Sequence, residues 1–303
     1  MGYDRIRPSL DIESNLKKWY RSWGQIMDKE CPKMFLAKAA RGFLCRAVIL
    51  LCFWSAPATA VQWIELDVNG TPVRSILGVP SEPGPHPAVI FNHGTGVRHL
   101  GYEGSKNRGQ MDVSRFTDAL VHDGYVALAP IRPFNSDTAY VERGGKVGSE
   151  QDWTEVVERG IDTVKAALAY LSARDDVMRD KIGVIGFSEG GNVTLWTAAE
   201  TRGFAAVVLM SPASIRDSGG YRLRNAAARN RVAAIRAPVF LSLGENDLRS
   251  IKKVVTRRLV PILQATNEGF EYRLDYPGDH SWFHQLRDDY WLDIAGFLGK
   301  HLK

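Results

Sequence analysis

The chain has 303 residues, of which 45% are hydrophobic and 24% charged, an ordinary composition for a globular protein of one or two domains. Its net charge of +5 comes from 39 Lys and Arg against 34 Asp and Glu. The first 60 residues hold ten of the basic and five of the acidic residues, so residues 61–303 hold 29 of each kind. Because that part of the chain is formally neutral, its charge does not support a nucleic-acid-binding surface, and no nucleic-acid partner is expected.

The first recognisable pattern along the chain is a leader. Four basic residues, the last of them Arg46, precede the apolar run 47–54 and the small residues Ser-Ala-Pro-Ala-Thr-Ala at 55–60. This order predicts a signal peptide over residues 34–60, with cleavage after Ala60 and export to the periplasm or outside the cell. The apolar run is much shorter than the ~20 residues of a membrane-spanning helix, so stable membrane insertion is not expected.

A polar segment, residues 1–33, precedes this leader. We expect it to be a non-native or polar extension, with translation beginning at Met27 or Met34; the alternative is an N-terminal anchor or amphipathic arm. All three cysteines, Cys31, Cys45 and Cys52, lie before the expected cleavage site. The mature protein therefore needs no disulfide.

Residues 61–303 predict one α/β domain that opens with an antiparallel pair of strands turning at Asn69-Gly70. Strands are expected at 61–68, 74–79, 88–92, 125–130, 182–187, 205–210, 239–243 and 272–276, and helices at 111–123, 149–173, 192–200, 251–264 and about 284–301. This alternation predicts a mostly parallel, twisted sheet of about eight strands with helices on both faces. The stretch 213–236 has the length of one helix and its loops, so no cap domain is expected.

The buried strand 88–92 ends in His93-Gly94-Thr95-Gly96. A glycine loop after such a strand lets backbone N–H groups face a substrate oxygen, which predicts part of an oxyanion hole; the alternative is an ordinary glycine turn. The ring of His93 is expected to hold this loop in place rather than to react.

The segment around Ser188 carries the most specific motif. An apolar, β-branched run ends in Gly186-Phe187-Ser188-Glu189-Gly190, and a helical pattern follows. Strand, G-x-S-x-G and helix in this order predict a nucleophile elbow, in which the serine occupies a strained turn and the flanking glycines allow close backbone approach. The bare motif recurs by chance, so its placement between strand and helix is what gives it weight.

An elbow serine needs an acid and then a base further along the chain. Asp247 follows the buried strand 239–243 at its carboxyl end and is the candidate acid; Glu245 is its rival, and a helix cap is the structural alternative. His280 follows the strand 272–276 in a turn and is the candidate base. His284 lies four residues on and would allow a metal site, but no H-E-x-x-H glutamate separates the pair, so no metal is expected.

Together these segments make the chain resemble the α/β-hydrolase fold, and within it the dienelactone hydrolase family and its esterase and peptidase relatives. The matching segments are FNHGTG, GYVALAPIRP, GFSEGG, GEND and PGDHSWF, within residues 61–302. The resemblance implies Ser188 as nucleophile, His280 as base and Asp247 as orienting acid, with the N–H groups of Thr95 and Glu189 in the oxyanion hole. Dienelactone hydrolases proper carry cysteine at the position of Ser188, which favours a general serine esterase here.

The loops near 96–108, 134–148 and 213–221 are expected to border an open pocket for a small-molecule ester. Tyr102, Trp153 and Trp282 are candidates to line it, with ordinary core packing as the alternative. Four arginines lie in or near the same loops and are expected on the solvated surface, the alternative being contact with an anionic acyl group: Arg98, Arg108, Arg132 and Arg143.

The leading hypothesis is hydrolysis of carboxylic esters through an acyl-enzyme, with no metal or organic cofactor needed. A serine peptidase of related fold is the second enzymatic hypothesis. A binding protein on a catalytically inactive hydrolase fold is the hypothesis of a different class. Without a cap, the open pocket predicts a preference for short acyl chains.

Overall fold

The computed structural model describes residues 61–132, 150–213 and 219–303. The expected extension (1–33) and signal peptide (34–60) lie outside the described residues, as do residues 133–149 and 214–218. None of the described helices is long and apolar enough to cross a membrane.

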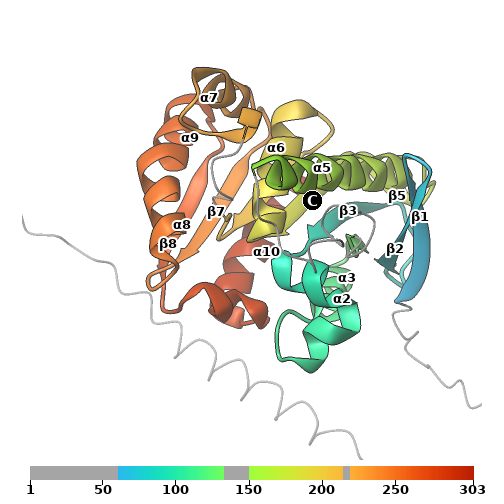
Figure 1. Ribbon diagram of the computed structural model, residues 1–303. Helices are drawn as coiled ribbons and strands as arrows, with labels where there is room; N and C mark the ends of the chain where they lie inside the picture. The colour runs from blue at the N-terminus through green and yellow to red at the C-terminus, as the bar shows by residue number, and fades with distance from the viewer. Residues whose placement is uncertain (1–60, 133–149, 214–218) are drawn as a thin grey trace, which may run out of the picture. The chain divides into compact units, whose positions relative to one another are not determined.

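The centre of the domain is an eight-stranded sheet in the order β1-β2-β4-β3-β5-β6-β7-β8 (Figure 1). The strands are β1 Gln62–Val68, β2 Thr71–Gly78, β3 His86–Asn92, β4 Val126–Pro130, β5 Val177–Phe187, β6 Ala206–Met210, β7 Val239–Gly244 and β8 Glu271–Tyr276. Only β2 runs against its neighbours β1 and β4, and every other neighbouring pair is parallel. The expected mostly parallel sheet is confirmed.

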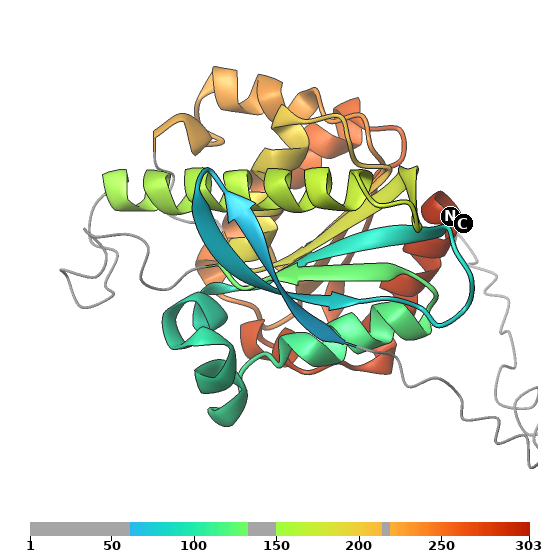
Figure 2. The same ribbon diagram turned by 90° about the vertical axis from the view of Figure 1, so that its right-hand side faces the viewer.

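Helices cover both faces of this sheet. They are α2 Thr95–Asn107, α3 Val113–His122, α5 Glu150–Ser172, α6 Glu189–Glu200, α7 Ala226–Ala233, α8 Arg249–Val254, α9 Val260–Thr266 and α10 Asp288–Leu302, with a π-helical segment η2 at Val255–Leu259 and 3-10 turns η1 Gly219–Tyr221 and η3 His280–His284. Figure 2 shows α5 along one face of the sheet, and α3 with α10 along the other.

Two hydrophobic clusters follow from this layering. On one face the apolar side of α5 and the helices α6 to α9 pack on residues such as Val184 and Leu209 of the sheet. On the other face α3 and α10 pack on Val89, Ile185 and Val208. Neighbouring residues in the second half of β5, 182–187, thus enter opposite cores, which explains why this part of the strand is continuously apolar rather than alternating.

Two elements differ from the sequence expectation. The stretch 96–108, expected as a loop, is helix α2, which a glycine with positive φ at Gly101 (φ 70°) breaks into two parts. Its three glycines, Gly96, Gly101 and Gly104, conceal the helical pattern in the sequence. The expected helix 251–264 is three pieces: α8, the π-helical segment and α9, with Pro261 near the start of α9. Proline has no N–H for the hydrogen bond of a continuous α-helix, so the wider turn falls just before it.

Candidate active site

Ser188 occupies a sharp turn between β5 and α6. Its backbone is in a region that L-residues rarely adopt (φ 54°, ψ −117°), and its N–H donates to the carbonyl of Met210 at 3.0 Å. A methyl group at Gly186 would collide with the carbonyl oxygen of Gly190, and one at Gly190 with that of Asn92. The two glycines of the motif are therefore required by steric contact on either side of the serine.

Ser188, His280 and Asp247 form one chain of hydrogen bonds, although up to 92 residues separate them. The distance between His280 Nε2 and Ser188 Oγ is 2.8 Å, and that between His280 Nδ1 and Asp247 Oδ1 is 3.0 Å. A carboxylate only accepts, so Nδ1 donates to Asp247 and Nε2 accepts from the serine hydroxyl. This is the geometry that a serine nucleophile and its base require.

Asp247, rather than Glu245, reaches the histidine. Asp247 is 5% exposed in the loop after β7, whereas Glu245 is exposed. The Glu245 backbone N–H donates to the carbonyl of Tyr276 at 2.7 Å, and its carbonyl accepts from Lys252 Nζ. The residue that precedes α8 is Leu248, and no side-chain cap bond is formed there. Asp247 is therefore not the N-cap residue of α8, which was the structural alternative for it.

Ser211 is a contact of this group that the sequence reasoning missed. It follows β6 directly with a positive φ of 43°, and its hydroxyl donates to Asp247 Oδ2 and lies 2.9 Å from His280 Nδ1. The carboxyl ends of parallel strands meet at one edge of the sheet, and Ser211 stands at such an end. That position is the signal by which it could have been found.

The ring of His280 packs on the strand that carries the nucleophile. It stacks on Phe187 with centroids 5.1 Å apart, while His284 meets the same ring edge-on at 5.4 Å. Burial, together with the neighbouring His280, lowers the pKa of His284. Within the described ranges, no group of three or more His, Cys, Asp or Glu side chains is arranged to hold a metal ion.

The loop after β3 comes close to the serine from the other side. A methyl group at Gly94 would lie 3.2 Å from Cβ of Ser188. Thr95 is the first residue of α2 and Glu189 the first of α6. Backbone N–H groups in the first turn of a helix have no partner within that helix, so both N–H groups are of the kind that binds an anion.

The Glu189 side chain turns away from the serine into a buried ionic cluster, which we call the Glu189 cluster: Glu189, Arg98, Arg132 and Thr95. Arg98 donates to both carboxylate oxygens at 2.8 Å, Arg132 Nη1 donates to Oε1 at 2.6 Å, and Thr95 Oγ1 donates to Oε2 at 3.0 Å. Burial alone would raise the pKa of Glu189, but the charges of Arg132 and Arg98 hold it well below its usual range.

The expectation that Arg98 and Arg132 lie on the solvated surface is wrong. Their side chains are 6% and 3% exposed, because each compensates the buried carboxylate of Glu189. Arg143 lies outside the described residues.

His93 fastens the same loop, as expected for a structural role. Its Nδ1 donates to the carbonyl of Gly94 at 2.9 Å, and its Nε2 accepts the backbone N–H of Arg132 at 2.9 Å. The Arg132 guanidinium also donates to the His93 carbonyl. Complete burial and the charge of Arg132 lower the pKa of His93 to about 3, so the ring is neutral.

The three aromatic candidates for substrate contact come from three different elements: Tyr102 from α2, Trp153 from α5 and Trp282 from η3. Tyr102 meets the ring of Trp63 edge-on at 5.1 Å. Trp282 packs against Tyr276, with centroids 5.8 Å apart, in the aromatic cluster beneath η3. Trp153 is half-buried on α5. The contacts of Trp282 are those of a side chain packed in the core, which was the alternative to substrate contact.

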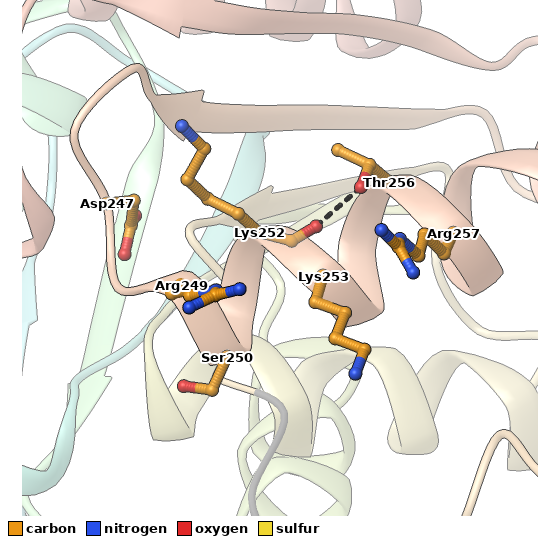
Figure 3. A pocket seen from close by; sticks show the side chains of 7 residues that line it. All are labelled: Asp247, Arg249, Ser250, Lys252, Lys253, Thr256 and Arg257. Carbon is orange, nitrogen blue, oxygen red and sulfur yellow. Dashed lines mark hydrogen bonds between the residues drawn. The ribbon is translucent and has the colours of Figure 1, made fainter.

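A basic groove of about 760 Å³ lies beside Asp247, the acid that bonds to His280 (Figure 3). It is lined by Asp247, Arg249, Ser250, Lys252, Lys253, Thr256 and Arg257. Four of these seven residues are cationic and one is a carboxylate, which already bonds to His280. The groove is therefore electropositive and attracts anions.

An open, mostly parallel sheet with a serine at a strand–helix elbow defines the class of α/β-hydrolases. The sequence model of the dienelactone hydrolase family matches residues 73–293. The chain belongs to this family.

Two relatives in sequence are consistent with that membership. The provisionally named hydrolase YtaP of Bacillus subtilis (strain 168) is 32% identical over 158 residues, which are 46% of this chain and 48% of YtaP. The match therefore spans about half the length of that relative. A protein of Aquifex aeolicus (strain VF5), provisionally named carboxymethylenebutenolidase, is 27% identical over 190 residues, 61% of this chain and 71% of its own.

Solved structures share the fold. The esterase Pf2001 of Pyrococcus furiosus superposes with a TM-score of 0.59 at 20% identity, covering 81% of this chain and 94% of its own. A dienelactone hydrolase-like promiscuous phosphotriesterase, P91 from metagenomic libraries, gives 0.61 at 15% identity, covering 81% and 100%. At such identities the likeness concerns the fold alone.

Proposed function

We propose that this protein hydrolyses carboxylic esters of small molecules through an acyl-enzyme on Ser188. The observation that carries the proposal is the continuous hydrogen-bonded chain from Ser188 through His280 to Asp247. Membership of the dienelactone hydrolase family supports it. A serine in place of that family's cysteine favours a general esterase.

The reaction follows from the atoms of this chain. Ser188 Oγ attacks the ester carbonyl carbon while His280 Nε2 takes its proton, and Asp247 stabilises the charged ring. The carbonyl oxygen gains negative charge in the tetrahedral intermediate, and the N–H groups of Thr95 and Glu189 donate to it. His280 then gives the proton to the leaving alcohol. Water, deprotonated by His280, attacks the acyl carbon and releases the acid and Ser188.

Substrate size follows from the loops around the site. The stretches between β4 and α5 and between β6 and η1 include residues outside the described ranges, but both are too short to fold as a cap domain. Without a cap, most of a long acyl chain stays in water and gains little of the ~0.8 kcal/mol per methylene that burial offers. Short acyl esters are therefore the proposed substrates.

The test separates an esterase from an inactive binding protein. A fluorophosphonate probe should label the purified protein, and Ser188→Ala should abolish both labelling and ester hydrolysis, the latter by about 10⁶-fold in kcat. Ser114→Ala is the matched control, since that hydroxyl bonds only locally to Asp112 at 2.7 Å. A folded Ser188→Ala protein that keeps a tenth of the activity contradicts the proposal. Hydrolysis of peptides but not of esters would favour the peptidase alternative.

The N-terminal sequence supports a further part of the proposal. Its basic, apolar and small residues in that order favour export, with the mature protein beginning at Val61.

A further inference from the structure

The Glu189 cluster joins three segments of the chain that are far apart in sequence. Glu189 starts α6, Thr95 and Arg98 belong to the first turn of α2, and Arg132 follows β4. Every oxygen of the carboxylate is used: Oε1 accepts from Arg98 and Arg132, and Oε2 from Arg98 and Thr95. A buried polar network whose carboxylate is fully bonded in this way is rigid, because moving any member leaves a buried charge without its partner.

The cluster acts on two residues whose backbone matters for the proposed reaction. Thr95 and Glu189 supply the two N–H donors to the oxyanion, and a side-chain hydrogen bond of 3.0 Å connects these same two residues. The spacing of the donors is therefore tied to a contact between side chains. A donor displaced by 1 Å loses much of its effect on the transition state.

The position of the carboxylate is also unusual in electrostatic terms. A negative charge on the residue after the nucleophile opposes the negative charge that develops on the substrate oxygen. Arg98 and Arg132 compensate it in the buried interior, with side chains 6% and 3% exposed. The Glu189 carboxylate can therefore connect α6 rigidly to α2, and the two arginines balance its negative charge next to the serine.

We propose that the Glu189 cluster is a positioning device for the oxyanion hole: the Glu189 carboxylate holds the Thr95 hydroxyl, and through it the N–H of Thr95, at a fixed distance from the N–H of Glu189. Glu189 and Thr95 are positioning residues through their side chains, while their backbone groups contact the reacting oxygen. This inference rests on the proposed esterase function.

The informative variant is Thr95→Val, which removes the hydroxyl but keeps the shape of the side chain and the backbone N–H. Glu189→Gln is less suitable, since it leaves two buried arginines undercompensated and endangers folding. Thr197→Val is the matched control: Thr197 is buried, lies on α6, and donates to the carbonyl of Val193 at 2.8 Å, whereas Thr95 is half-buried. Thr95→Ser restores the hydroxyl.

Two measurements on each purified protein distinguish positioning from stability. The first is kcat and KM for an aryl acetate. The second is the Ki of a trifluoromethyl ketone, which adds to the serine hydroxyl and places an oxyanion in the hole. Thr95→Val should lower kcat between about 10-fold and 10²-fold, leave KM within about twofold, and raise Ki by the same factor as kcat falls. Thr197→Val should change none of these, and Thr95→Ser should recover most of kcat.

The possible results separate this inference from the function on which it rests. If Ser188→Ala abolishes hydrolysis but Thr95→Val keeps kcat and Ki within twofold of the wild type, the positioning role is wrong and the esterase remains. Equal losses in Thr95→Val and Thr197→Val would also overturn it, because they would reflect destabilisation alone. If Ser188→Ala keeps its activity, the function itself fails.

Discussion

The buried histidine of the β3–α2 loop should make the protein less stable in mild acid. Burial and Arg132 lower the pKa of His93 from 6.5 to about 3, so the folded ring stays neutral while the ring of the unfolded chain takes up a proton below pH 6.5. The unfolded state therefore binds more protons between pH 6.5 and 3, and the free energy of unfolding falls as the pH falls through that window. The slope is about 1.4 kcal/mol per pH unit.

Between pH 7 and pH 5 this single group should remove about 2 kcal/mol from the free energy of unfolding. Urea unfolding at the two pH values measures the loss, with fluorescence of the buried Trp196 and Trp291 as the signal. Glu189 does not contribute in this window, because a carboxyl with a lowered pKa loses stability only below its usual value of 4.5.

His93→Gln isolates the contribution of this ring. A glutamine oxygen can accept the N–H of Arg132 in place of Nε2, and it does not titrate. Since burial also lowers the pKa values of His99 and His284, they add a background of the same sign to both proteins. The variant should lose about 2 kcal/mol less than the wild type between pH 7 and pH 5. Equal losses in the two proteins would refute the assignment of His93 as a buried neutral ring.

Four other outcomes are expected. Ser211→Ala should lower kcat about 10-fold to 10²-fold with little change in KM, because Asp247 Oδ2 loses its hydrogen-bond donor. Unchanged kinetics would show that Ser211 has no role in catalysis. In a series of aryl esters, kcat/KM should peak between acetyl and butyryl, and a maximum at decanoyl or longer would reveal a deep apolar channel. For an ester carrying a carboxylate, kcat/KM should fall more steeply with salt than for a neutral ester, and Lys253→Ala should reduce that difference. N-terminal sequencing of protein from the native host should begin at Val61; an intact Met1 on cytoplasmic material would contradict export.

The elbow and the sheet could be predicted from the sequence because both depend on local chemistry. Gly186 and Gly190 are required by contacts within a few residues of Ser188 or with the neighbouring strand, so the motif carries its own steric reason. The strands are short apolar runs between helical patterns, and that alternation permits few sheet topologies. Where glycines weaken the periodicity, as in α2, the same reasoning expected a loop in place of a helix.

Only the tertiary structure decided which side chains meet. Asp247 and Glu245 stand in one loop, and their separate directions follow from how β7 and β8 end. Ser211 reaches Asp247 from the next strand. The sequence gives the identity of each residue, but it does not distinguish an arginine that is buried from one that is exposed to solvent. Arg132 is buried because a carboxylate 57 residues further along the chain lies beside it, and only the folded chain brings that pair together.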